Sequence, residues 1–141
     1  MRVFLDTNVL VSAFATRGLC ADIVRHVLAE HELVTGEVVI AEVRRVLRQC
    51  IKLPWAVVAE VERLLRDQIV VPKPAKPHRL PIRDTDDHWV LATALARNAD
   101  VLVTVDSDLL DIAARAPLAI VSSRGFWNVA KGGSGSETGN E

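Results

Sequence analysis

The chain has 141 residues, of which 50% are hydrophobic and 25% are charged, and its formal net charge is −1. This apolar fraction is too high, and this net charge too small, for an intrinsically disordered protein. No uninterrupted apolar run approaches the roughly 18 residues that a membrane-spanning helix requires. The composition therefore predicts one soluble globular domain with a substantial core.

Short apolar runs alternate with amphipathic patterns along the first half of the chain. A strand is expected at Val3–Leu5, and the polar residues Asp6–Asn8 end it and can cap the helix that follows. Because Asp6 stands where a secretory signal would need apolar residues, we expect a cytoplasmic protein. The next patterns predict a helix at 21–28, a strand at 32–35, a helix from Thr35 as its cap to about Cys50, a helix at 57–65 and a strand at 69–71.

Four prolines within residues 72–83 exclude a helix or a central strand there. Beyond this loop the patterns predict a helix at 87–97, a strand at 101–104, a short helix at 109–114 and a strand at 119–121. Residues 131–141 are rich in Gly, Ser and Thr, so we expect a flexible tail after a domain at 1–130. The alternation predicts an α/β fold with three layers, α/β/α, around a mainly parallel sheet of about five strands.

Acidic residues fall where a parallel sheet binds its ligands, outside the carboxyl ends of the strands. Asp6 directly follows the strand at 3–5, and Asp106 stands two residues after the strand at 101–104. The further acidic candidates are Asp108, the run Asp84, Asp86 and Asp87 at the start of the preceding helix, and Glu42 in the helix that begins near Thr35.

Carboxylates gathered within a few ångströms repel one another unless a cation neutralises them. Convergent acids therefore predict a hard divalent metal, Mg²⁺ or Mn²⁺, because these ions prefer oxygen ligands whereas Zn²⁺ usually takes His or Cys. Asn8 can add an amide oxygen or hold Asp6 in place, and Thr104 can donate a hydrogen bond to an acid or a phosphate.

Each acidic position also has an ordinary structural explanation. Asp6 can cap a helix, Glu42 can lie at the edge of a buried stripe, and Asp106 can belong to a turn. The acidic run near residue 87 can be a solvated helix start. The combination favours a site, because four independent explanations would all have to hold while the acids still fall at one edge of the sheet.

Three blocks of sequence resemble the PIN-domain nucleases, in particular the toxins of prokaryotic toxin–antitoxin systems. They are VFLDTNVLVSA at 3–13, VVIAEVRRVL at 38–47 and RDTDDHWVLATALARNADVLVTVDSDLL at 83–110. The segment LAIVSSRGFW at 118–127 is similar to the closing strand of that family and the short segment after it. The resemblance covers nearly the whole chain before the tail and implies a PIN-like fold.

The resemblance also assigns roles to the acids. The catalytic quartet of the family falls on Asp6, Glu42, Asp87 and Asp106, and the expected metal ligands are Asp6, Asp87 and Asp106. The supporting positions are Asn8, Thr104, Asp84 and Asp108. Val105 stands where relatives often carry Gly before the last acid, so the turn around Asp106 is expected to differ from theirs.

The resemblance implies an endoribonuclease that uses Mg²⁺ or Mn²⁺ to hydrolyse RNA phosphodiester bonds, leaving a 5′-phosphate and a 3′-hydroxyl. It further implies an RNA substrate, a cognate antitoxin protein and a homodimer as partners, and no membrane. One alternative is a catalytically silent PIN-like module that binds RNA or a protein; loss of acids would mark it, and none is lost. A haloacid-dehalogenase or receiver-like phosphotransfer site is disfavoured, since both need a late Lys and only Lys131 follows residue 76.

The charge of the chain is segregated, although its sum is close to zero. Residues 43–83 carry ten basic and three acidic side chains, a net charge of +7, whereas residues 84–111 carry seven Asp and one Arg, a net charge of −6. This pattern is typical of an acidic metal pocket beside a basic surface for nucleic acid. The candidates for contacting RNA are Arg44, Arg45, Arg48, Lys76, Arg79 and Arg83. Trp89 can pack in the core or stack on a base, and core packing is the favoured interpretation.

Overall fold

The fold is built on a parallel sheet of five strands, in the order β3-β2-β1-β4-β5. The computed structural model describes residues 1–80 and 85–132. The strands are β1 (Arg2–Leu5), β2 (Glu32–Gly36), β3 (Ile69–Val71), β4 (Val101–Val103) and β5 (Ala119–Val121). Every neighbouring pair is parallel, so all carboxyl ends of the strands lie at one edge of the sheet.

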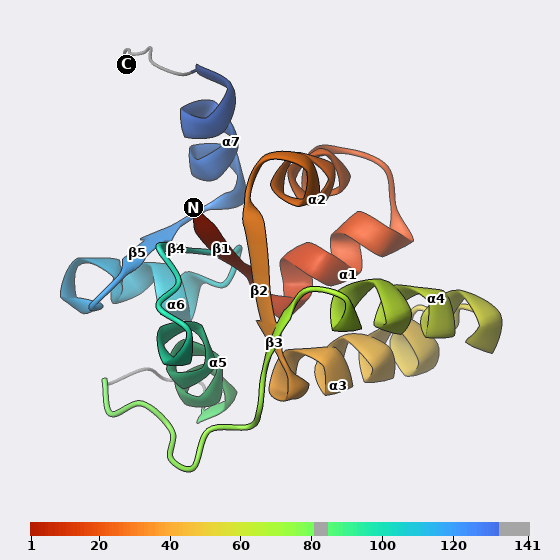
Figure 1. Ribbon diagram of the computed structural model, residues 1–141, viewed down its shortest axis with the longest axis horizontal. Coiled ribbons are helices and arrows are strands. Elements are labelled where there is room, and N and C mark those ends of the chain that lie inside the picture. The colour runs from red at the N-terminus through yellow and green to blue at the C-terminus, as the bar shows by residue number, and fades with distance from the viewer. Residues whose placement is uncertain (81–84, 133–141) are drawn as a thin grey trace.

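Helices cover both faces of this sheet. Figure 1 shows α1, α2, α3 and α4 on one side of it and α5 and α6 on the other. Their bounds are α1 (Thr7–Ala15), α2 (Leu19–Glu30), α3 (Glu37–Arg45), α4 (Trp55–Arg66), α5 (Thr85–Ala96), α6 (Ser107–Asp111) and α7 (Ser123–Gly132). A π-helical turn, Val46–Cys50, extends α3, and a 3₁₀ turn, Ala113–Arg115, follows α6. The expected three-layer α/β/α architecture is confirmed.

Residues 3–5 of β1 and all three residues of β4 are apolar because helices cover both faces of these strands. Val3, Phe4 and Leu5 of β1 are completely buried, and the three residues of β4 are buried beside them. The short runs without alternation therefore identified these strands correctly. Among the residues that the structure describes, no helix combines the length and the hydropathy needed to cross a bilayer.

Some expected boundaries are wrong. Thr35 does not cap α3: it lies in β2, paired with Val70 of β3, and Gly36 takes the N-cap position without a side-chain hydrogen bond. Pairing with β3 therefore extends β2 to Gly36, one residue beyond the strand expected at 32–35. The helix α7 ends at Gly132, two residues into the segment expected as a tail, and residues 133–141 lie outside the described residues.

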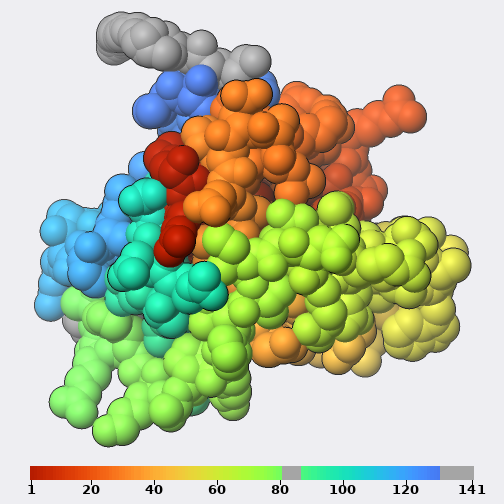
Figure 2. Space-filling model, in the orientation of Figure 1, coloured from red at the N-terminus to blue at the C-terminus, as the bar shows by residue number. Residues whose placement is uncertain are grey.

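The proline-containing loop begins after β3 and lies beside α5. The amide N–H of His78 donates to the carbonyl oxygen of His88 at 2.9 Å, which ties the loop to the first turns of α5. Figure 2 shows the green residues of this loop projecting at the lower left of the molecule. Its described part, up to Leu80, contains neither helix nor strand, as the prolines predicted.

Gly36 marks the point where β2 passes directly into α3. A Cβ atom at this position would collide with the Cγ2 methyl group of Thr93 in α5 and would lie 3.0 Å from the carbonyl oxygen of Val71. Thr93 is completely buried, so its methyl group cannot move aside into solvent. The absence of a side chain at Gly36 allows α5 to pack against the start of the helix that carries Glu42.

We predict that Gly36→Ala lowers the free energy of unfolding by about 1–3 kcal/mol, the usual cost of overpacking a closed core. Chemical denaturation followed by circular dichroism measures this change. Thr93→Ser removes the opposing methyl group, so Gly36→Ala combined with Thr93→Ser should recover part of the loss. A Gly36→Ala protein as stable as the wild type would contradict the packing described here.

Candidate metal-binding active site

The strand order places a crevice between the ends of β1 and β4. The chain passes from β1 outward to β2 and β3, and then returns to β4 on the opposite side of β1. Ligands of open α/β sheets bind at such a switch point, because the loops after the two strands diverge there. Asp6 directly follows β1, and Asp106 follows β4 by three residues, so both lie at this crevice.

Asp6 is buried and serves as the N-cap of α1. Its Oδ1 accepts a hydrogen bond from the backbone N–H of Thr7 at 2.8 Å, and its Oδ2 accepts one from the hydroxyl group of Thr104 at 2.7 Å. The helix cap and the site residue, which the sequence offered as alternatives, are thus the same carboxylate. Capping fixes the orientation of the Asp6 side chain relative to both strands.

Thr104 joins the two sides of the crevice. Its hydroxyl oxygen donates to Asp6 and also accepts the backbone N–H of Asp106 at 2.9 Å. Thr104 is completely buried, so water does not compete for these bonds. Val105, next in the chain, is exposed and does not have a positive φ, so this turn needs no glycine. The expected hydrogen bond from Thr104 to an acid is present.

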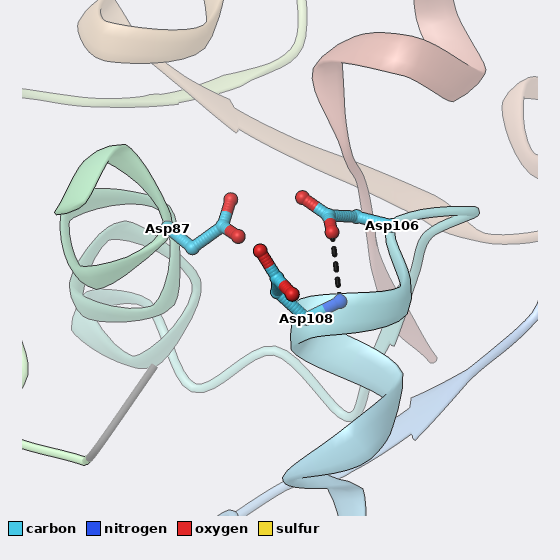
Figure 3. Close-up of side chains that lie close together, drawn as sticks. All are labelled: Asp87, Asp106 and Asp108. Carbon is cyan, nitrogen blue, oxygen red and sulfur yellow. Dashed lines mark hydrogen bonds between the residues drawn. The ribbon is translucent and has the colours of Figure 1, made fainter. Parts of the chain in front are cut away.

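Three further carboxylates converge from α5 and α6. One carboxylate oxygen from each of Asp87, Asp106 and Asp108 lies within 4.8 Å of the other two. Asp87 is buried near the start of α5, while the other two are half-buried. Figure 3 shows the Asp87 carboxylate directed toward the other two, and the backbone N–H of Asp108 donating to Asp106 Oδ1 at 2.8 Å.

A cavity of about 190 Å³ brings the whole predicted quartet together. It is lined by Asp6, Thr7, Asn8, Val38, Glu42, Asp87, Trp89, Val90 and Asp106. Glu42 reaches it from the middle of α3, and Asn8 from the first turn of α1. Residues from four separate segments thus meet at the carboxyl edge of the sheet, as the strand-end argument predicted.

The pKa of Asp6 is raised above its ordinary value of 3.8, chiefly because burial removes water from the carboxylate. The negative charges of Asp106 and Glu42 raise this pKa further, whereas the hydrogen bonds from Thr104 and Thr7 lower it. Asp6 therefore lies in a site where negative charge accumulates. A positive ion would relieve this repulsion.

The donor set suits a hard divalent cation. Carboxylate oxygens are the ligands that Mg²⁺ and Mn²⁺ prefer, and several can bind one ion together with water. Among the described residues that line the cavity, none is Lys, Arg, His or Cys, so no lining side chain neutralises the acids and none suggests a zinc site. The residues present therefore fit the metal that the sequence predicted.

The predicted RNA-contacting residues lie in different settings. Arg45 donates to the Oε1 of Glu42 at 3.0 Å, which places its guanidinium beside the cavity. Arg44 instead pairs with Glu62 of α4 at 3.2 Å. Arg48 donates to the carbonyl oxygen of Leu53 and lies over the ring of Trp55. Lys76 and Arg79 are exposed in the proline-containing loop, while Arg83 and Asp84 lie outside the described residues.

For Trp89 the sequence favoured core packing over stacking on a base. It was expected in the core, yet its half-buried side chain lines the cavity two residues after Asp87. The ammonium group of Lys73, from the proline-containing loop, lies 4.6 Å from the centre of its ring. The sequence did place Trp89 two residues after Asp87, near the start of a helix. Helical periodicity alone, however, does not show whether such a side chain faces the core or the cavity.

The PIN-domain family model matches residues 2–108 of this chain. The chain belongs to the PIN-domain family. The matched region contains all four acids that line the cavity. The expected membership of the PIN-domain family is therefore confirmed.

The fold of this PIN domain is similar to one in a crystal structure of VapBC2 from Rickettsia felis bound to a DNA fragment from their promoter. The similarity has a TM-score of 0.62 at 18% sequence identity, and it covers 86% of this chain and 98% of the chain in that structure. No curated protein matches the chain in sequence. The similarity to VapBC2 concerns the fold.

We predict that, without metal, Asp6→Asn makes the PIN domain more stable at neutral pH. Because its pKa is raised on folding, the native chain binds more protons than the unfolded chain above about pH 3.8, and the wild type loses stability as Asp6 ionises. An uncharged Asn avoids this loss. The difference in melting temperature should disappear at pH values below about 3.8, where Asp6 is protonated in both states.

Thermal unfolding in EDTA from acidic to neutral pH measures this difference. Asp67→Asn at the exposed end of α4 is the matched control, because that carboxylate is not buried. Equal effects of the two substitutions at neutral pH would show that burial at Asp6 has no energetic consequence.

Proposed function

We propose that this PIN domain is an endoribonuclease that requires Mg²⁺ or Mn²⁺ and acts as the toxin of a toxin–antitoxin pair. The observation that carries the proposal is the convergence of Asp6, Glu42, Asp87 and Asp106 on one cavity at the switch point of the sheet. Membership of the PIN-domain family supports nuclease chemistry at this cavity.

Asp6, Asp87 and Asp106 would hold the metal, and Asp108 adds a fourth carboxylate to the set. Asp108 lies within the same cluster as two of these ligands, and its backbone N–H orients Asp106. When bound, a divalent ion lowers the pKa of a coordinated water molecule and places positive charge beside a phosphate. Thr104 holds Asp6 in place and fixes the start of the segment that carries Asp106.

The reaction proposed is direct hydrolysis. The oxygen of a water molecule attacks the phosphorus atom, the bond from phosphorus to the 3′-oxygen breaks, and that oxygen leaves as a 3′-hydroxyl, so the other product keeps a 5′-phosphate. Glu42 is in a position to complete the metal site or to orient the water, and its contact with Arg45 limits its rotamers. Among the described lining residues no Ser, Cys or His offers a covalent alternative.

The substrate class follows from the basic residues around this acidic cavity. Arg45 at its edge, and Lys76 and Arg79 in the loop beside α5, are the residues we propose for the phosphates of RNA. The roles of Arg44, Arg48 and Arg83 stay predictions. A strand bound by these groups would pass over the cavity with one phosphate facing the carboxylates.

The toxin role rests on the sequence blocks that resemble PIN toxins, and with it come the proposed cognate antitoxin and homodimer. The VapBC2 structure with promoter DNA, whose fold is similar to that of this chain, supports the proposed toxin role through fold similarity alone. A small reading frame beside the one that encodes this chain, whose product forms a complex with it, would support the pairing. We favour catalysis over a silent binding module because all four acids line the cavity.

We predict that Asp6→Asn and Asp87→Asn each lower RNA cleavage by more than about 100-fold, because each removes a charged oxygen ligand from the proposed metal site. The measurement is the rate of cleavage of total RNA by the purified chain with Mg²⁺ or Mn²⁺, read on denaturing gels. EDTA should abolish the activity of the wild type.

Asp67→Asn serves as the control, since this exposed acid at the end of α4 does not line the cavity. It should cleave RNA at the wild-type rate. If Asp6→Asn keeps full activity while its fold is intact, the proposed function is wrong.

We predict that Thr104→Val lowers cleavage by about 10- to 100-fold, whereas Thr104→Ser keeps most of it. Valine matches threonine in shape but loses the hydroxyl group that joins Asp6 to the backbone of Asp106. Serine keeps that group. Rates over a range of Mn²⁺ concentrations distinguish weaker metal binding from slower chemistry, and similar rates for the Val and Ser variants would exclude the positioning role of Thr104.

A further inference from the structure

Trp89 presents an aromatic surface at the wall of the acidic cavity. The chain folds so that Trp89 lies two residues after Asp87 in α5, and both side chains line the same space. Trp127 is partly buried and packs against the hydrophobic core. Among the described residues, Trp89 does not belong to the group that packs there. Trp89 thus lies at the cavity wall and outside the described core cluster.

Lys73 places a positive charge on the same ring. Its ammonium group lies 4.6 Å from the ring centre, within the range of a cation–π contact. The loop that carries Lys73 is fixed to α5 through the bond from His78 to His88. An indole ring and a cation are thus held together beside the carboxylates, on the side of the cavity formed by α5.

Two apolar side chains continue the wall around Trp89. Val38 of α3 and Val90 of α5 also line the cavity, whereas its other lining residues are polar or acidic. The cavity therefore combines carboxylates, which suit an ion beside a phosphate, with apolar side chains and an aromatic ring. A nucleotide combines matching features, since a planar base is attached to a charged backbone.

We propose that Trp89 stacks against a nucleobase of single-stranded RNA next to the scissile phosphodiester, while Lys73 contacts a phosphate of the same strand. The proposal deepens the function proposed above and rests on it. Stacking on a tryptophan tolerates any base, because every base has a π-face. Trp89 and Lys73 together would select RNA strands without base pairing, since a base inside a duplex cannot reach the indole ring.

The test compares RNA affinity in the Asp6→Asn background with Mg²⁺, where RNA is bound without being cut. The probes are a fluorescently labelled single-stranded RNA and the same RNA annealed to its complement. Trp89→Ala should weaken binding of the single strand by roughly 5- to 100-fold, the usual loss for one stacked base. Binding of the duplex should change little, and Trp89→Phe should recover part of the affinity.

Trp55 offers a matched control. The guanidinium of Arg48 lies 4.7 Å from the centre of its ring, an arrangement like that of Lys73 and Trp89, but Trp55 is exposed and does not line the cavity. Trp55→Ala should leave affinity for both probes unchanged. This control separates stacking in the cavity from the general loss of an aromatic residue.

Salt dependence separates the two members of the pair. Lys73→Ala should reduce the slope of log affinity against log salt concentration by about 0.7 if this side chain neutralises one phosphate of a single strand. Trp89→Ala should leave this slope unchanged, because it removes no charge. A purely structural role for Trp89 would not produce this division.

A second measurement keeps Trp89 in place, in case its removal disturbs the fold. In the chain with Trp55→Phe and Trp127→Phe, Trp89 is the one remaining tryptophan, and the single-stranded RNA should quench its fluorescence whereas the duplex should not. Unchanged fluorescence at saturating single-stranded RNA would overturn the inference.

The outcomes distinguish this inference from the proposed function. If Asp6→Asn is inactive while Trp89→Ala binds the single strand as tightly as Trp55→Ala does, stacking is excluded and the nuclease proposal stands. If Asp6→Asn still cleaves RNA, or if the chain binds no RNA, the proposed function fails and the inference fails with it.

Discussion

Electrostatic repulsion among carboxylates is the constraint around which this PIN domain is arranged. Asp6, Asp87, Asp106 and Glu42 would separate if their backbones were free, because like charges repel one another at short range. The charges of Asp106 and Glu42 accordingly help to raise the pKa of Asp6. The buried strands and the caps of α1 and α6 prevent that separation. The energy of folding thus maintains a concentration of negative charge that a divalent cation would balance.

Much of the fold could be predicted because buried parallel strands and amphipathic helices have distinct periodicities. The strands at 69–71 and 119–121 are present with the predicted bounds. The boundary near Thr35 was missed because pairing with a strand more than thirty residues away, at Val70, decides where β2 ends. Such pairing is a tertiary effect that local patterns do not contain.

Asp6 and Asp106 could be predicted because topology fixes where strands end, and Glu42 and Asp87 because the sequence blocks around them resemble those of the family. The sequence could not decide between core packing and base stacking for Trp89, because the direction of its side chain depends on packing between α5 and the loop that carries Lys73. Arg44 and Arg45 are adjacent in sequence, yet one pairs with Glu62 and the other with Glu42. The charge pattern of the sequence identified the basic region, but it did not show which of its arginines lie beside the cavity.

The hydrogen bond between Thr104 and Asp6 joins residues that are 98 positions apart. A chain growing from its N-terminus makes Asp6 among its first residues, but it cannot orient this carboxylate until β4 has been synthesised and has inserted beside β1. Any activity of the cavity is consequently delayed until most of the domain has folded. The nascent chain carries Asp6 long before Thr104 and Asp106 are synthesised, so the acids that line the cavity cannot meet until most of the domain exists.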